Sequence, residues 1–452
     1  RLAVGICVAL RTRLLSLWSV LLCSIFEKEK MGKGGDQSST RAATRVVWKS
    51  KYNPLDKDAP NLPTKGQIKA VIPKECFQRS FVHSSMYLVR DLAMSAALGY
   101  LASVSLTTEL PALEDTVALV TFVVGWSMYA FWQGTIWTGL WVLAHECGHG
   151  AFSDSQALND MVGYVLHTAL LVPYFAWQYS HAKHHRRTNH LVDGESHVPC
   201  TKEGVGLSNN LKKKTSWAAL HELLGDEAYG VFELYTHLFL GFPIYLLGFT
   251  STGRLGNDGK PLDGKMMDHF RPHSPMFPEK FASKVALSTV GVIGVLLAAV
   301  YMSFVHGVVP VVCWYWGAYI FTNFWLVLYT WLKHTDPSIP HYGEGEWNWV
   351  KGALSTIDRP YGIFDFFHHR IGSTHVVHHL FHEMPFYNAK KATEAVKAYL
   401  EPKGLYNYDP TPWPLAAWRI ARTCHYVEDA TGIQYFKSLD DVKSYETMKK
   451  LE

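Results

Sequence analysis

Long apolar runs alternate with polar stretches along this chain and predict membrane-spanning helices. The first run covers residues 92–106 and extends back to Met86, and the second covers residues 117–143. A helix needs roughly 20 apolar residues to cross a bilayer, so the second run qualifies and the first is marginal. Pro111, Glu114 and Asp115 lie between them and predict a tight hairpin.

A third apolar region, residues 285–332, is too long for one span. As a single helix it would measure about 70 Å, whereas the hydrocarbon core of a bilayer is about 30 Å thick. His306, Gly307 and Pro310 interrupt the region, so we expect two spans, residues 285–305 and 308–332. The pattern predicts an all-α integral membrane protein with about four transmembrane helices.

Three short histidine clusters stand beside these apolar runs, and each has its histidines three or four residues apart. That spacing places side chains on one face of a helix. Imidazole is a common metal ligand, and eight imidazoles exceed the three or four protein ligands of one zinc ion. They suit two metal ions with a position left for a small reactant. The clusters are HECGH (His145, His149), HAKHH (His181, His184, His185) and HVVHH (His375, His378, His379).

The order of clusters and runs constrains the topology. If the clusters form one site, they lie on one side of the membrane, so residues 161–177, between the first two clusters, should not cross. Residues 231–249 should likewise lie in the interface or re-enter, since one more crossing would separate the third cluster from the others. The N-terminal arm, a helical cap with a histidine-rich di-metal site, and the C-terminal tail then share the cytosolic side.

Two other metal chemistries compete for the first cluster. HECGH matches the H-E-x-x-H motif of zinc proteases, in which the Glu is a general base, and Asp263 of an LDG triplet would be a third ligand. That alternative leaves six clustered histidines unexplained. A carboxylate-bridged di-iron site needs E-x-x-H on each of two helices, and Glu146–His149 is the one match in the chain. A pair of histidine-bound irons that activates O2 fits better.

Composition narrows the class of protein. The net charge is +4 and Lys and Arg form no long run, which argues against a nucleic-acid partner. The 16 Trp and 14% aromatic content suit a membrane interface. Seven scattered Cys do not form a disulfide framework, and a reducing compartment is the simpler explanation.

Both ends of the chain carry possible targeting signals. Arg11 and Arg13 precede an apolar stretch, residues 14–26, that resembles a signal-peptide core, but Met31 opens MGKGGDQSST. We expect residues 1–30 to lie upstream of the true start, with a targeting segment as the alternative. Residues 31–80 are polar and predict a soluble arm. The final KKLE, with Lys449 and Lys450, is similar to the dilysine signal that retains proteins in the endoplasmic reticulum.

The flanking sequence of the clusters resembles the membrane fatty acid desaturases, and the acyl-lipid Δ12 (omega-6) branch in particular. The resemblance rests on AHECGHGAFSD, LLVPYFAWQYSHAKHH, LKHTDPSIPHY and THVVHHLFHEMPFYNA, and it covers about residues 45–425. Gly150 after the first cluster is also typical of the omega-3 branch. The front-end branch opens its third box with Gln and carries an HPGG motif, whereas His375 stands here and HPGG does not occur.

The resemblance implies an oxidoreductase with two non-haem iron ions and O2 as co-substrate. It would introduce a cis double bond into a phospholipid-bound acyl chain, converting oleoyl to linoleoyl. Omega-3 desaturation and a related acyl hydroxylase or acetylenase are alternatives, and a membrane zinc protease is a more distant one. Cytochrome b5 and its NADH-dependent reductase would supply electrons. The expected location is the endoplasmic reticulum membrane, multi-pass with both termini cytosolic, with the plastid membrane as the alternative.

The resemblance also adds a ninth metal ligand. Related acyl-CoA desaturases have a further histidine after the fourth span, and His334 stands at that place. The metal ligands themselves are the expected catalytic residues. His190 is expected outside the metal shell, and Asp154 and Asp193 are candidates to orient imidazoles by accepting their N–H groups. The implied organisation is an extension and arm (1–80), a membrane desaturase domain (81–425) and a cytosolic tail (426–452).

Overall fold

The computed structural model describes residues 62–207, 217–249, 253–262 and 265–440, which belong to one compact unit. These residues form helices and one short antiparallel ribbon, in which β1 (His341–Tyr342) pairs with β2 (Ile433–Gln434). The prediction of an all-α protein is confirmed. The expectations for residues 1–30, Asp263, Lys449 and Lys450 concern positions outside the described residues.

Three helical stretches among the described residues are long and apolar enough to cross a membrane: Thr116–Gly148, Glu279–His306 and Val308–His334. The first is α4, and the second consists of η4 (Glu279–Phe281) and α10 (Ala282–His306). The third consists of α11 (Val308–Val311), the π-helical turn η5 (Val312–Trp316) and α12 (Gly317–His334). Between α10 and α11, Gly307 has a φ of +88°, so the predicted break falls at this glycine.

Helix α3 (Phe81–Ser105) corresponds to the marginal first run. Its 25 residues have the length of a span, but Arg90 and Asp91 interrupt its apolar sequence. Asp91 is buried and its Oδ2 lies 2.8 Å from Nε2 of His369, so the carboxylate faces protein rather than lipid. Large apolar side chains of α3, α4 and α10, such as Val89, Val120 and Leu297, are exposed on the outer faces of these helices, as expected for contact with lipid.

The two segments that were predicted not to cross are broken or irregular. Residues 156–186 form two short helices, α5 (Gln156–Ala169) and α6 (Tyr174–Arg186), which Pro173 helps to separate. Residues 217–246 form α7 (Trp217–Leu224), α8 (Asp226–Tyr235), the π turn η3 (Thr236–Leu240) and α9 (Gly241–Leu246). None of these meets the criteria for a span, and η3 packs on α12 through stacked rings of His237 and Trp331, with centroids 4.5 Å apart.

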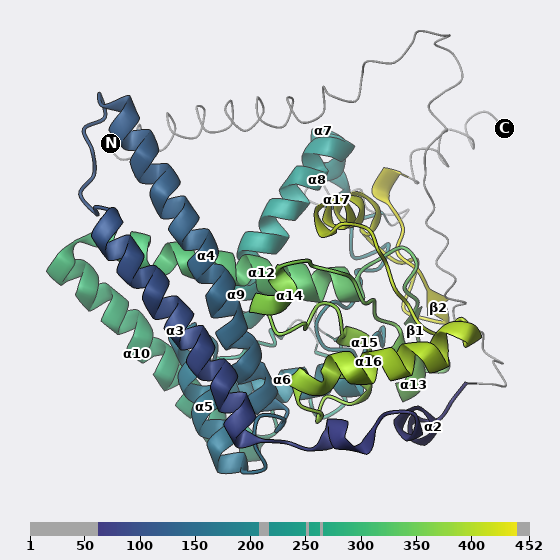
Figure 1. Cartoon of the computed structure of the whole chain (residues 1–452). Coiled ribbons are helices and arrows are strands. Elements are labelled where there is room, and N and C mark those ends of the chain that lie inside the picture. Colours follow the sequence, from purple (N-terminus) through teal and green to yellow (C-terminus); the bar gives the residue numbers. More distant parts are fainter. Residues whose placement is uncertain (1–61, 208–216, 250–252, 263–264, 441–452) are drawn as a thin grey trace, which may run out of the picture. The chain divides into compact units, whose positions relative to one another are not determined.

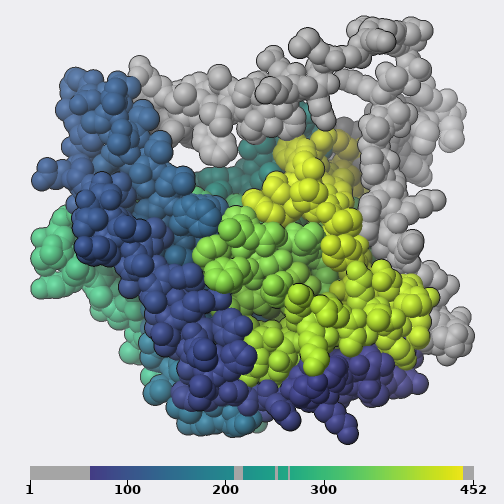
Figure 2. Space-filling view, viewed as in Figure 1, coloured from purple at the N-terminus to yellow at the C-terminus, as the bar shows by residue number. Residues whose placement is uncertain are grey.

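The C-terminal third supplies short helices that surround the end of α12 (Figure 1). They are α13 (Trp349–Leu354), α14 (Phe364–Phe367), α15 (His375–Leu380), α16 (Phe386–Leu400), η6 (Glu401–Lys403) and α17 (Trp413–Thr423). Val376, Val377 and Leu380 of α15 are fully buried in a core that also contains Ile68. Ile68 belongs to α2 (Lys65–Ala70), which with η2 (Lys74–Phe77) lies against the C-terminal elements (Figure 2).

Helices α4 and α12 approach each other closely at Gly134. A Cβ atom at this position would lie 2.6 Å from both the carbonyl oxygen of Ala318 and Cβ of Phe321. Further toward their C-terminal ends, the two helices contribute Trp141, Trp325 and Trp331 to the largest buried core. The glycine therefore lets the helices that end at the first histidine cluster and at His334 pack directly against each other.

We expect Gly134→Ala to lower the thermal midpoint of the detergent-solubilised protein. The added methyl must push α4 and α12 apart, and overpacking of this kind costs about 1–3 kcal/mol. Gly294→Ala in α10 is the matched control, because a Cβ there meets no atom within 4 Å and alanine favours helix by about 1 kcal/mol. Equal midpoints for the two variants would contradict the close approach.

Candidate metal centre

The first histidine cluster lies at the end of α4. His145 is in the last turn and His149 is the C-cap, so their rings stand one turn apart and their Nε2 atoms are 3.2 Å apart. Gly150, with a φ of +69°, turns the chain away from the helix axis. The membrane span thus continues directly into the candidate site.

Helix α6 presents its three histidines in two directions. The Nε2 atoms of His181 and His185 are 3.1 Å apart and face the first cluster. His184 points elsewhere, and its Nε2 lies 3.2 Å from Nε2 of His334 at the end of α12. Helical geometry separates neighbouring side chains by about 100°, which explains why His184 and His185 diverge.

Helix α15 divides its histidines in the same way. Nε2 of His375 lies 3.2 Å from that of His334 and 3.1 Å from that of His379. The ring of His378 instead lies 4.7 Å, between centroids, from the rings of both His145 and His185. Each triplet therefore contributes to two separate groups of imidazoles.

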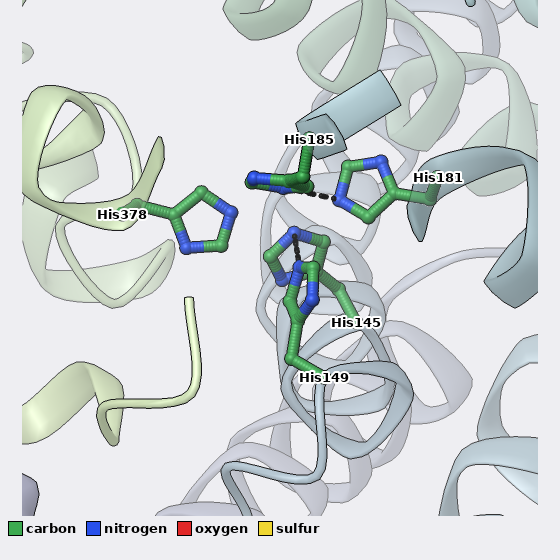
Figure 3. Close-up of side chains that lie close together, drawn as sticks. All are labelled: His145, His149, His181, His185 and His378. Atoms are coloured by element: carbon green, nitrogen blue, oxygen red, sulfur yellow. Dashed lines mark hydrogen bonds between the residues drawn. The ribbon is translucent and has the colours of Figure 1, made fainter. Parts of the chain in front are cut away.

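Five histidines from α4, α6 and α15 form the first group, and their rings turn toward a common point (Figure 3). One nitrogen from each ring lies within 4.8 Å of the others; the members are His145, His149, His181, His185 and His378. A second group is formed by His184, His334 and His379, and His375 joins it through the contacts of its Nε2 with those of His334 and His379, which makes four histidines. All nine histidines predicted as ligands belong to one group or the other.

The spacing of nitrogens in both groups fits metal ions. Two nitrogens bound at about 2.1 Å to one ion are about 3.0–3.4 Å apart when the angle at the ion is about 90–109°. The five Nε2–Nε2 distances are 3.1–3.2 Å. Nε2 of His378 is buried and has no hydrogen-bond partner among the described residues, which leaves its lone pair for a ligand. Among those residues, neither group includes a carboxylate or a thiol.

Burial keeps these imidazoles neutral. It lowers the pKa of His149, His181 and His185 well below the usual value, and neighbouring imidazoles lower it further. Burial also lowers the pKa of His184 to about 4. Neutral imidazole is the form that binds metals, because one ring nitrogen then has a free lone pair.

Oxygen acceptors around the groups decide which ring nitrogen is protonated. Nδ1 of His184 donates to the carbonyl of Glu195 at 2.8 Å. Thr188 Oγ1 donates to the His184 carbonyl at 2.7 Å, so it accepts from Nδ1 of His379 at 3.1 Å. Nδ1 of His145 lies 3.2 Å from Oε1 of Glu146. In His184 and His379, Nε2 therefore carries the lone pair and faces the other imidazoles, as in metal sites.

Asp358 caps the N-terminus of α15 and orients this helix. Its Oδ1 accepts hydrogen bonds from the backbone N–H groups of His375 at 2.6 Å and Val376 at 3.0 Å. Its Oδ2 accepts from the Tyr406 hydroxyl at 2.5 Å. A carboxylate at a helix N-terminus satisfies unpaired N–H groups and interacts favourably with the helix dipole. Asp358 thus fixes the short helix that carries three of the nine histidines.

A buried ion network is centred on Arg359, the residue that follows Asp358 in the chain. Arg359 is fully buried, and it contacts Asp409 through Nε and Asp336 through a terminal nitrogen, each at 3.0 Å. Arg419 of α17 contacts the same two carboxylates at 2.7 Å. Asp336 follows His334 by two residues, so the network links the end of α12 to the segment that caps α15.

Some of the expected supporting residues have other roles. Asp154 pairs with Arg79 at 3.2 Å and is 78% exposed, while Asp193 pairs with Lys183 and Arg187. The prediction that these carboxylates orient the imidazoles was therefore wrong, because both carboxylates form ion pairs with neighbouring Lys and Arg side chains instead. His190 lies outside both groups, as predicted, and its Nε2 contacts Glu344 at 3.0 Å.

His382 is a neighbour of the site that sequence analysis missed. Its ring centroid lies 4.8 Å from that of His149 and 4.9 Å from that of His185. It follows His379 by three residues, a helical spacing that could have signalled it, but α15 ends at Leu380. The sequence did not indicate that Asp358, Thr188 or the Glu195 carbonyl would support the histidines. Carboxylates, hydroxyls and backbone carbonyls occur in every loop, and no motif distinguishes these three.

We expect Asp358→Ala to reduce the metal content of the purified protein. Removal of the carboxylate leaves two N–H groups of α15 without an acceptor, and loss of such supporting contacts typically weakens metal binding by about 10–100-fold. Asp358→Asn keeps one acceptor oxygen and should lose less. Asp429→Ala, an exposed acceptor for Thr431, is the control. Metal analysis after competition with a chelator measures the effect, and full retention by Asp358→Ala would disprove it.

Comparison with known proteins gives a consistent result. The fatty acid desaturase family model matches residues 121–410. The Delta(12)-fatty-acid desaturase of Vernicia fordii is 40% identical over 82% of this chain and 88% of its own length. The Delta(12) fatty acid desaturase of Mortierella isabellina is 40% identical over 82% and 90%. The omega-6 fatty acid desaturase, endoplasmic reticulum isozyme 2, of Glycine max is 39% identical over 88% and 96%.

The matched region contains all nine histidines of the two groups. The relatives are covered over nearly their whole length, so the similarity is not confined to the clusters. The chain belongs to the fatty acid desaturase family.

Proposed function

We propose that this chain is an O2-dependent acyl-lipid desaturase that introduces a cis double bond at the Δ12 position of a phospholipid-bound oleoyl chain. The convergence of nine neutral imidazoles in two groups carries the proposal. Relatives from Vernicia and Mortierella, named as Δ12 desaturases, support the position of the double bond.

The proposed cofactor is a pair of non-haem iron ions. His145, His149, His181, His185 and His378 would hold one ion, and His184, His334, His375 and His379 would hold the other. When bound, the pair would supply O2 activation and the oxidising power that removes two hydrogens from the acyl chain. Nitrogen ligands without thiolates suit iron, which can also keep positions open for small reactants.

The residues beside the histidines provide an apolar wall. The ring of Trp177 stacks on His181 with centroids 4.4 Å apart, and Trp141 stacks on His145 at 5.7 Å. Both tryptophans belong to the largest buried core, which continues through Leu238 and Phe242. We propose that this wall excludes water from the centre and accepts the acyl chain, which has no polar groups to satisfy.

The convergence of the clusters also supports the proposed topology. Histidines on both sides of the α10–α12 pair meet, so the chain between them would cross the membrane an even number of times. We place the protein in the endoplasmic reticulum membrane, the organelle that the names of the relatives from Glycine max and Brassica juncea give, and we propose that the histidines and both termini face the cytosol. Cytochrome b5 and its NADH-dependent reductase are the proposed electron donors, and residues 81–425 the proposed desaturase domain.

Expression in yeast, which makes oleate but little linoleate, tests the reaction. We expect a dienoic C18 product with the new double bond at Δ12, identified by gas chromatography and mass spectrometry of derivatised fatty acids. Trienoic products formed only from added linoleate would replace this proposal with omega-3 desaturation. A hydroxylated or acetylenic product would identify the corresponding alternative, and zinc without iron in the purified protein would favour the protease.

The variant His181→Ala tests the ligand assignment. We expect it to accumulate normally in the membrane, to lose iron and to form less than about 1% of the wild-type product, because even groups that only orient ligands change activity by about 10–100-fold. His306→Ala, an exposed histidine at the end of α10, should retain both iron and activity. Normal iron content and turnover in His181→Ala would exclude this residue as a ligand.

A further inference from the structure

A second cluster of metal-binding side chains lies apart from the nine histidines. It combines His221 of α7, Asp226 at the start of α8, and Asp440 near the C-terminus. One donor atom from each residue lies within 4.8 Å of the other two. Nε2 of His221 is 3.8 Å from Oδ1 of Asp226 and 3.8 Å from Oδ1 of Asp440.

His221 is the feature that points to a ligand. Its side chain is 2% exposed, and its Nε2 has no hydrogen-bond partner among the described residues. The distances to the two carboxylates are too long for hydrogen bonds. An unsatisfied buried polar group costs about 1–3 kcal/mol, and a metal ion between this nitrogen and the two carboxylate oxygens would remove that cost.

The surroundings hold the Asp226 carboxylate and the backbone at Asp440 in position. Arg422 contacts Oδ2 of Asp226 through its guanidinium, which leaves Oδ1 toward His221. The Asp440 N–H donates to Oγ of Ser438 at 3.2 Å, and the Leu439 N–H donates to Nδ1 of His425 at 3.0 Å. Leu439 is itself buried in a core with Tyr229 of α8. Metal-binding carboxylates are commonly oriented by hydrogen bonds such as the one that Asp226 accepts from Arg422.

The donor set and the distances fit zinc. Zn2+ binds imidazole nitrogen and aspartate oxygen at about 2.0–2.2 Å, and two such atoms are about 3.8 Å apart when the angle at the ion is about 130°. A nitrogen donor among three ligands favours zinc over magnesium or calcium, which prefer oxygen alone. We propose that His221, Asp226 and Asp440 form a third metal site, which binds Zn2+ and links the C-terminal segment to α7 and α8.

Zinc binding to the purified full-length protein tests this site. Equilibrium dialysis against buffered Zn2+, followed by metal analysis, should give one more equivalent for the wild type than for His221→Ala or Asp440→Asn. Affinity at the extra site should fall more than about 100-fold, since loss of a ligand exceeds the 10–100-fold effect of an outer group. Glu227→Gln, which changes the carboxylate next to Asp226 but outside the cluster, should keep wild-type stoichiometry.

Two further measurements complete the zinc-binding test. Desaturation of oleate reports whether the variants fold, and limited proteolysis reports whether zinc stabilises the C-terminal segment. His221→Ala and Asp440→Asn should retain product formation, which shows that they fold and that the histidine centre is intact. In the wild type, chelation should accelerate cleavage within residues 425–440 and added Zn2+ should reverse this, whereas Asp440→Asn should not respond to Zn2+. Equal zinc stoichiometry in the wild type and both variants, or cleavage of the wild type that is indifferent to Zn2+, would overturn the proposal.

Discussion

The mutual approach of unprotonated imidazole nitrogens is the constraint on which this structure depends. Nε2 atoms that carry lone pairs repel one another at 3.1–3.2 Å unless a proton or a cation lies between them. For His184 and His379 the protein fixes the ring by a hydrogen bond between Nδ1 and a backbone or side-chain oxygen. Burial then disfavours the alternative of protonating the rings, because a charged imidazole would lose its hydration.

The rest of the fold serves to bring the rings to this arrangement. Helices α4 and α12 pack closely at Gly134 and deliver His145, His149 and His334 from their ends. The C-terminal parts of both long helices are buried among other elements, which positions their last turns. The short helix α15 has no such length, and it depends on the Asp358 carboxylate and the Arg359 network instead. Two different means of support thus meet at one centre.

The sequence was sufficient where the relevant physics is local. Apolar length and the break at Gly307 predicted the three spans found among the described residues, and spacing of three and four residues predicted the eight clustered histidines as ligands, whereas His334 was added by the resemblance to acyl-CoA desaturases. It did not predict how each triplet divides, because that depends on the rotation of α6 and α15 about their axes. Asp154 and Asp193 were wrongly chosen as supports, since proximity in sequence gave no information on their basic partners. His382 lies beyond the end of α15, where helical spacing no longer applies.

The division of each triplet has a consequence for how the two groups relate. His184 and His185 are adjacent in the chain but belong to different groups, and His378 and His379 repeat this on α15. The separation of the two groups is therefore set by the covalent geometry of two helices rather than by a shared bridging side chain. Any rotation of α6 or α15 that improves one group must disturb the other. The centre can accordingly be tuned only as a unit, because a change that moves the histidines of one group also moves those of the other.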